Sequence, residues 1–142
     1  MSNFLTEQQM ASLVEAIQSA EKYSTGEIRV HIDSYSGGNN AEIAFDVFKT
    51  LCQNQTAEKN AVLFHINFDE HYLTIIGDEG IHAKVHQQFW DQMHDRITAS
   101  FARGNYFEGL RNAILETGQE LKKHFPLSGE NRNELPNEIT FS

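Results

Sequence analysis

The stretch that decides the fold is AVLFHINFDEHYLTII, residues 61–76. Residues 61–68 are almost continuously apolar, as expected of a central strand that is covered on both faces. A short polar link at residues 67–71 leads to a second apolar run at residues 72–76. Because the link is so short, the two runs are predicted to form an antiparallel hairpin.

A further strand and a helix are predicted upstream of this hairpin. Apolar and polar residues alternate over residues 27–32, which is typical of a strand. Helical periodicity follows at residues 43–51, with Asn39 or Asn40 as the helix cap. Because a strand–helix–strand unit crosses over on one side of a sheet, the strands at 27–32 and 61–68 are predicted to run parallel.

Helical patterns also occupy most of the remaining chain. Residues 7–22 open with a capping box formed by Thr6 and Gln9. Apolar residues then recur at helical spacing over residues 85–97 and over residues 110–121. Each pattern predicts an amphipathic helix with one buried face.

Helices on both faces of a small mixed sheet predict an α/β fold, a three-layer α/β/α sandwich. Residues 1–126 have the length and composition of a single domain, which ends where Pro126 stops the last helix. Residues 127–142 are polar with little periodicity and are expected to form a mobile tail.

The composition excludes several classes of partner. The formal net charge of −9, without any cluster of basic residues, opposes binding to nucleic acid. No apolar run approaches the roughly 20 residues that span a bilayer, and no signal peptide is recognisable, so a cytoplasmic protein without stable membrane insertion is expected. The single Cys52 excludes an internal disulfide and a multi-thiolate metal site. The sequence carries no signal for a particular oligomeric state.

The predicted topology brings three loop segments to one edge of the sheet. Two parallel strands start at the edge where the antiparallel strand ends. Residues 24–27, residues 59–60 and residues 77–80 should therefore meet there, and this edge is called the rim below.

The rim is predicted to hold a divalent cation. Asp78 and Glu79 lie between two glycines, where the backbone can approach a ligand closely and two carboxylates can supply oxygen ligands. Glu27 and Asn60 would complete an oxygen-rich site, for which calcium is the expected ion. The alternative is ordinary turn chemistry at Asp78 and Glu79, with Glu27 as a solvated strand end.

Two histidines follow the same loop. His82 and His86 are four residues apart at the start of a predicted helix, so they would share one helix face and could bind a transition metal. The alternative is a pair of surface histidines near a helix start. No function is predicted for the other five histidines.

Signals for an enzyme are few, and no catalytic residue is predicted. A cysteine-based phosphate loop, an Asp-x-Asp pair and a nucleotide-binding glycine loop are all absent from the sequence, so no nucleotide cofactor is expected. Metal-assisted hydrolysis at the rim remains, with Lys59 or Arg29 as anion-binding contacts. Structural salt bridges are the alternative use of both cations.

Three segments resemble the TPM domain family. They are Ala20–Val30 (AEKYSTGEIRV), Thr56–Leu63 (TAEKNAVL) and Ile75–Ile81 (IIGDEGI). The resemblance spans residues 4–126 and points to bacterial members without an assigned activity. It implies an α/β/α fold, a divalent-cation site in some members, and the weak acid phosphatase activity of a plant relative.

The sequence is therefore compatible with three functions. The first is a cation-binding TPM domain in which calcium stabilises the fold or shapes a partner-binding surface. The second is a metal-dependent acid phosphatase. The third is a metal-free protein-interaction module in which residues 33–40 and the tail contact a protein partner.

Overall fold

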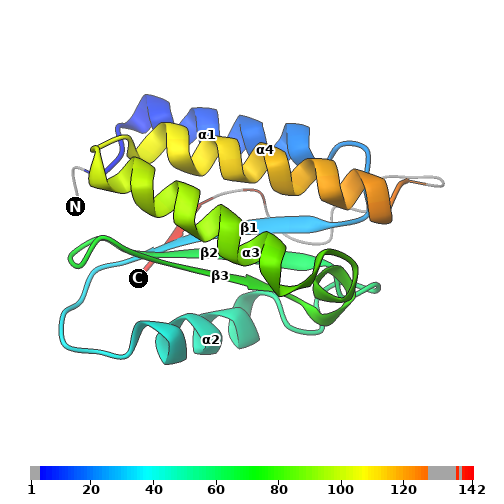
Figure 1. The fold of residues 1–142 in the computed structure, drawn as a ribbon, viewed down its shortest axis with the longest axis horizontal. Coiled ribbons are helices and arrows are strands. Elements are labelled where there is room, and N and C mark those ends of the chain that lie inside the picture. The colour runs from blue at the N-terminus through cyan, green and yellow to red at the C-terminus, as the bar shows by residue number, and fades with distance from the viewer. Residues whose placement is uncertain (1–3, 128–136, 138) are drawn as a thin grey trace.

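The computed structural model describes residues 4–127, 137 and 139–142, and it contains four helices and four strands there (Figure 1). In chain order they are α1 (Glu7–Glu21), β1 (Glu27–Asp33), α2 (Asn40–Leu51), β2 (Ala61–Asn67), β3 (Tyr72–Gly77), α3 (Glu79–Ala102), α4 (Tyr106–His124) and β4 (Thr140–Phe141).

The strands form one mixed sheet in the order β3-β2-β1-β4. β1 and β2 are parallel, and β2 and β3 are antiparallel, as predicted. The helix α2 lies below the sheet in Figure 1, whereas α1, α3 and α4 lie above it. The predicted three-layer α/β/α sandwich is therefore confirmed.

The local signals explain where the elements begin. Thr6 and Gln9 form the predicted capping box: the backbone N–H of each donates to the side chain of the other, both at 3.0 Å. Asn39 caps α2 by accepting the backbone N–H of Glu42. Asp78 is the cap residue of α3, and its side chain accepts the N–H of the next residue, Glu79.

Two hydrophobic cores lie on opposite faces of the sheet. The larger core packs apolar residues of β1 and β2 against α1, α3 and α4. The smaller core holds Phe48 and Cys52 of the α2 region against Ala61 and Leu63 of β2. The sheet face toward α2 thus has far less apolar packing than the other face.

β1 is buried on both faces although apolar and polar residues alternate along it. All seven of its residues are buried, including Glu27, Arg29, His31 and Asp33. By alternation these four side chains point to the face covered by α2. Together with His65 and Asn67 of β2 they form a buried polar surface, called the polar face below.

Two further differences concern α3 and the tail. The backbone of His86 has φ 65° and ψ 169°, so α3 is broken into two helical pieces there. Thr140 and Phe141 form β4 beside β1, within a segment predicted to be a tail. The part of that tail at residues 128–136 and 138 lies outside the described residues.

Candidate functional site

Backbone hydrogen bonds join the three predicted segments of the rim. The N–H of Glu27 donates to the carbonyl of Asn60 at 3.4 Å, and the N–H of Asp78 donates to the carbonyl of Ala61 at 2.9 Å. The N–H of Gly80 donates to the carbonyl of Lys59 at 2.7 Å. The segments therefore meet at one edge, as the topology predicted.

Gly80 permits the closest of these approaches. A Cβ atom built at this position would lie 2.2 Å from the carbonyl oxygen of Glu58 and 2.6 Å from that of Lys59. Both contacts are with backbone, which cannot swing away as a side chain can. Any larger residue would therefore separate the start of α3 from the loop before β2.

Three of the predicted ligands are buried at the rim: Glu27 (2% exposed), Asn60 (0%) and Asp78 (7%). Asp78 Oδ1 accepts the N–H of Glu79 at 2.8 Å, but Asp78 Oδ2 has no protein partner. Asn60 Nδ2 donates to Thr25 Oγ1 at 3.0 Å, whereas Asn60 Oδ1 has no protein partner. A buried acceptor without a donor is unfavourable, so both oxygens suit a bound cation or water.

A third buried acid, Glu21 at the end of α1, was missed in the sequence. Its Oε2 atom accepts the N–H of Ile28 at 2.6 Å. Burial, followed by the nearby charge of Glu27, raises the pKa of Glu21 to about 9, so this carboxyl holds a proton at neutral pH. The helical period does place Glu21 four residues after buried Ile17, and that was the available signal.

Arg29 is the buried cation of this region. It is 5% exposed, and its Nε has no hydrogen-bond partner. Its positive charge partly offsets the rise in the pKa of Glu21 and of Cys52, so Arg29 lies near both groups. Burial nevertheless raises the pKa of Cys52 to about 12, so its thiol is not a ready nucleophile.

Glu79 and Lys59 lie outside the buried group. Their side chains are 82% and 52% exposed and form an ion pair at 3.4 Å. Glu79 would have to leave Lys59 before it could bind a rim cation. Exposed pairs of this kind contribute little to stability, so that exchange is not costly.

The predicted pairing of His82 and His86 on one helix face is wrong. The break at His86 interrupts the helical spacing on which it depended. His82 Nδ1 also accepts a hydrogen bond from Trp90 Nε1 at 3.2 Å. Among the residues that the structure describes, no three His, Cys, Asp or Glu side chains are grouped as a metal-binding set.

A second polar group occupies the other end of the polar face. His65 Nε2 lies 2.8 Å from Asp33 Oδ2, and His31 Nε2 lies 3.5 Å from the same oxygen. Burial, as the largest cause, lowers the pKa of His31. Two residues around β4, Thr140 and Ser142, hydrogen-bond to the ring nitrogens of His31. Strand alternation and the parallel register could have predicted this cluster, because His31 and His65 are directly paired.

Hydrogen bonds fix the loop that precedes α2 beside this second group. Ser34 Oγ donates to Asp69 Oδ1 at 2.9 Å, and Asn40 Nδ2 donates to Glu70 Oε1 at 2.8 Å. Asn67 Nδ2 also donates to Glu70. The loop is thus held against the turn between β2 and β3.

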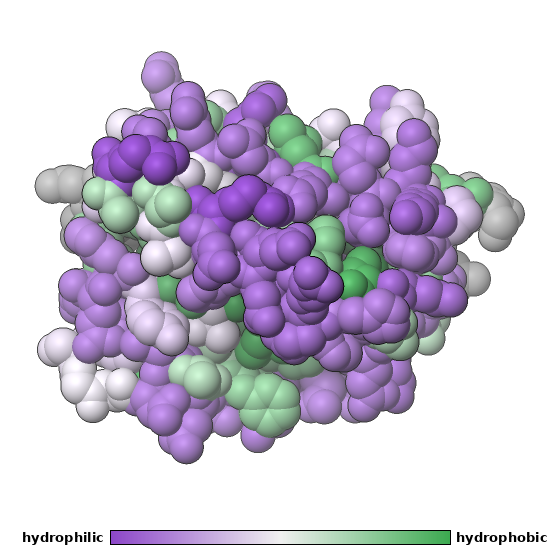
Figure 2. Space-filling view, viewed as in Figure 1, coloured by the Kyte–Doolittle hydropathy of each residue, from purple (hydrophilic) through white to green (hydrophobic). Residues whose placement is uncertain are grey.

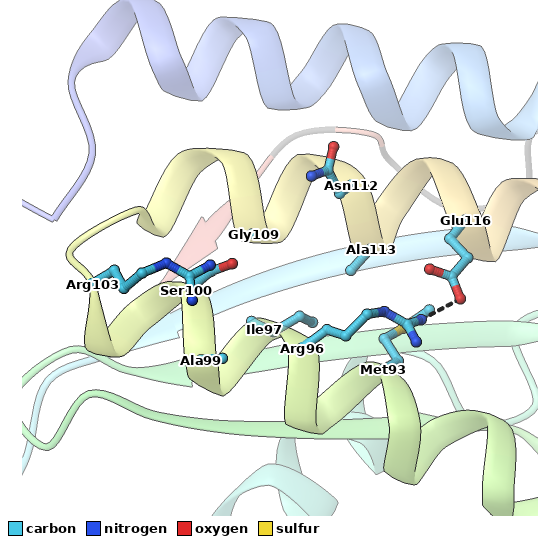
Figure 3. Close-up of a pocket in the computed structure, with 10 residues that line it drawn as sticks. All are labelled: Met93, Arg96, Ile97, Ala99, Ser100, Arg103, Gly109, Asn112, Ala113 and Glu116. Carbon is cyan, nitrogen blue, oxygen red and sulfur yellow. Dashed lines mark hydrogen bonds and ion pairs between the residues drawn. The ribbon is translucent and has the colours of Figure 1, made fainter.

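A cavity of about 270 Å³ lies between α3 and α4 (Figure 3). Arg96 and Arg103 extend along it, and Arg96 forms an ion pair with Glu116. Small side chains, including those of Ala99 and Ala113, leave the hollow open. The charged side chains that line the cavity are exposed, and no buried reactive group is among its lining residues.

The face of the molecule drawn in Figure 2 exposes little apolar surface. In the view of Figure 2 it is mostly hydrophilic, with small and separate hydrophobic parts. The large apolar side chains that are exposed among the described residues are Tyr23, Phe45, Tyr72 and Phe141. In the same part of the chain, no helix combines the length and apolar character needed to cross a bilayer.

Comparison with known families agrees with this architecture. The profile of the TPM domain family matches residues 1–120. The chain belongs to the TPM domain family. No curated protein matches it.

Two NMR structures are among the solved structures that are similar to this TPM domain. The NMR structure of the BA42 protein from the psychrophilic bacterium Bizionia argentinensis has a TM-score of 0.90 and 36% sequence identity, over 100% of this chain and 98% of BA42. The N-terminal domain of a P. gingivalis protein has a TM-score of 0.70 and 20% identity, over 89% of this chain and 84% of that domain. The second likeness concerns the fold alone.

Proposed function

We propose that this TPM domain binds a divalent cation at the rim, with calcium as the expected ion. Asp78, Asn60 and Glu27 are the proposed ligands, and Glu79 joins them when it leaves Lys59. The bound ion stabilises the fold or shapes a surface for a protein partner.

The observation that carries the proposal is the pair of buried acceptors without donors, Asp78 Oδ2 and Asn60 Oδ1. Charge supports it as well. Glu27 and Asp78 bring two buried acids to a region whose buried cation is Arg29 alone among the described residues, and Glu21 adds a third acid that keeps its proton. A cation would satisfy the oxygens and balance this charge together.

The chemistry of the donors favours a hard, hydrated ion. Calcium accepts carboxylate, amide and backbone oxygens together with water. The protein supplies few ligands, so the ion would keep several waters, and a dissociation constant of about 10⁻⁴–10⁻³ M is expected. Zinc is disfavoured because His82 already accepts the indole N–H of Trp90.

The test is an amide NMR titration of chelator-treated protein with calcium, magnesium and zinc. Saturable shifts are expected at residues 26–27, 60 and 77–80 with calcium, together with a rise in melting temperature. The Asp78→Asn variant should lose both effects. Absence of any shift at millimolar cation would reject the site.

A matched control separates the rim ligands from general surface charge. Glu58 is exposed in the loop beside the rim, and Glu58→Gln removes the same charge as Asp78→Asn. The control should keep the calcium shifts. If both variants weaken binding equally, the effect is long-range electrostatics and the ligand assignment fails.

A metal-dependent acid phosphatase is the second candidate, and the unpaired Nε of buried Arg29 favours it. A cation at Asp78 would activate water, while Arg29 would contact the phosphoryl oxygens. Cation-dependent hydrolysis of p-nitrophenyl phosphate, lost in Asp78→Asn while the fold persists, is the expected result. Unchanged turnover in that variant would refute this candidate.

A further inference from the structure

Near the end of β1 that is far from the rim, the side of this strand not paired with β2 already binds an extended segment of the chain. His31 and Ile32 pair in parallel with Thr140 and Phe141, and the N–H of Ser142 donates to the carbonyl of Ile32 at 3.2 Å. β4 is only two residues long, whereas β1 has seven. Such an edge offers backbone donors and acceptors to any chain that can lie extended beside it.

Side-chain hydroxyls fix residues 140–142 in place, and Ile139 before them packs against the larger core. Thr140 Oγ1 lies 2.7 Å from His31 Nδ1, and Ser142 Oγ lies 2.9 Å from His31 Nε2. Ser142 also donates to Asp33. Phe141 between them is 42% exposed, so its ring is incompletely buried.

The recognising groups are held rigidly from behind. Asp33 is bound by His65 at 2.8 Å, and the rings of His31 and His65 stack with centroids 5.7 Å apart. The recognising groups therefore all lie on the paired strands β1 and β2.

Two cavities flank β4 and could take larger side chains. One, of about 360 Å³, lies toward α2 and is lined by His31, Asp46 and Ser142 among others. The other, of about 400 Å³, lies on the opposite face and is lined by Ile32, Asp69 and Phe141 among others. Carboxylates border both, and the chain carries a net charge of −9.

We propose that this edge is a docking groove for an extended segment of a protein partner, with the pattern Ser/Thr–apolar–Ser/Thr and adjacent Lys or Arg. The hydroxyls bind His31 and Asp33, the apolar residue lies on the opposite face, and the basic residues complement Asp46 and Asp69. Residues 140–142 occupy the groove in cis and compete with the partner. The groove is independent of the cation site at the rim, so either can fail alone.

The reach of the groove is limited on the rim side. Ile28 lies on β1 between the rim and the residues that pair with β4. Its N–H donates to Glu21 Oε2 at 2.6 Å. Glu21 thereby blocks further pairing toward the rim. The partner segment is therefore short, pairing with the end of β1 near His31 and Asp33 as β4 does.

The test uses the full chain and a synthetic peptide, KITFSK, which carries the hydroxyl pattern with flanking lysines. A second peptide, KIAFAK, lacks both hydroxyls. Binding is followed by amide and histidine NMR signals in wild type and in the double variant Thr140→Ala/Ser142→Ala, whose own segment is weakened while His31 and Asp33 are unchanged.

KITFSK should shift the signals of residues 31–33 and His65, and it should bind the double variant about tenfold more tightly than wild type, because the competing segment opens more often. KIAFAK should bind about tenfold or more weakly than KITFSK. Equal binding of the two peptides, or no saturable shift at millimolar KITFSK in either the double variant or wild type, would overturn the proposal. Since wild type should show the same shifts at higher peptide concentration, the test holds even if the double variant folds poorly.

Discussion

Replacement of Glu21 by glutamine should stabilise the protein at neutral and alkaline pH. Glu21 lies buried at the end of α1, accepts the N–H of Ile28, and has its pKa raised from 4.5 to about 9. Glutamine can still accept that hydrogen bond through its carbonyl oxygen. Unlike glutamate, it never has to lose a proton in the interior.

The sign and size follow from proton linkage. Above pH 4.5 the unfolded chain releases the Glu21 proton, whereas the folded chain keeps it until about pH 9. The unfolded state then binds fewer protons, so the free energy of unfolding falls by about 1.4 kcal/mol per pH unit in this window. Relative to Glu21→Gln, wild type should lose on the order of 3 kcal/mol between pH 4.5 and pH 7.

The assay is urea denaturation followed by circular dichroism at several pH values from 5 to 9, with chelator present throughout. Wild type and Glu21→Gln should be close at pH 5 and diverge as the pH rises. Glu15→Gln, an exposed position on the same helix, is the matched control and should run parallel to wild type. A constant difference between wild type and Glu21→Gln across the pH range would refute a buried, protonated Glu21.

Two other predictions follow from the packing. Gly80→Ala should destabilise the fold by about 1–3 kcal/mol, because its Cβ would meet the backbone carbonyls of Glu58 and Lys59; a melting temperature equal to wild type would contradict this contact. Cys52 should resist thiol reagents in the native state, because it is fully buried and its pKa is raised to about 12; labelling as fast in buffer as in denaturant would show that α2 does not protect it.

Most of the fold could be predicted from local patterns in the sequence. The capping box at Thr6, the continuous apolar run of β2 and the short link to β3 each have one structural interpretation, and all three agree with the structure. β4 could not be predicted in the same way. Thr140, one of its two paired residues, hydrogen-bonds to a ring nitrogen of His31, more than a hundred positions earlier in the chain.

For the candidate sites, the positions of the loops could be predicted from the sequence, whereas the orientations of the side chains could not. Topology alone brought Glu27, Asn60 and Asp78 to the rim, because strand direction determines which loops share an edge. The orientation of each side chain was beyond such reasoning. Glu79 turns outward to Lys59 although it is next to Asp78, and the positive φ of His86 is not encoded by helical spacing.

The polar face accounts for the placement of both proposed sites. Four alternate residues of β1 bury charge or imidazole beneath α2, where apolar side chains would pack more favourably, and such residues need compensating partners at each end of the strand. At the rim these are Glu21, Asn60 and the proposed cation; at the other end they are His65 and the hydroxyls beside β4. Seven residues at about 3.3 Å each separate the two ends by roughly 20 Å, beyond the range at which substitutions usually couple. Variants at the rim and in the groove should therefore act additively, each reporting on its own site.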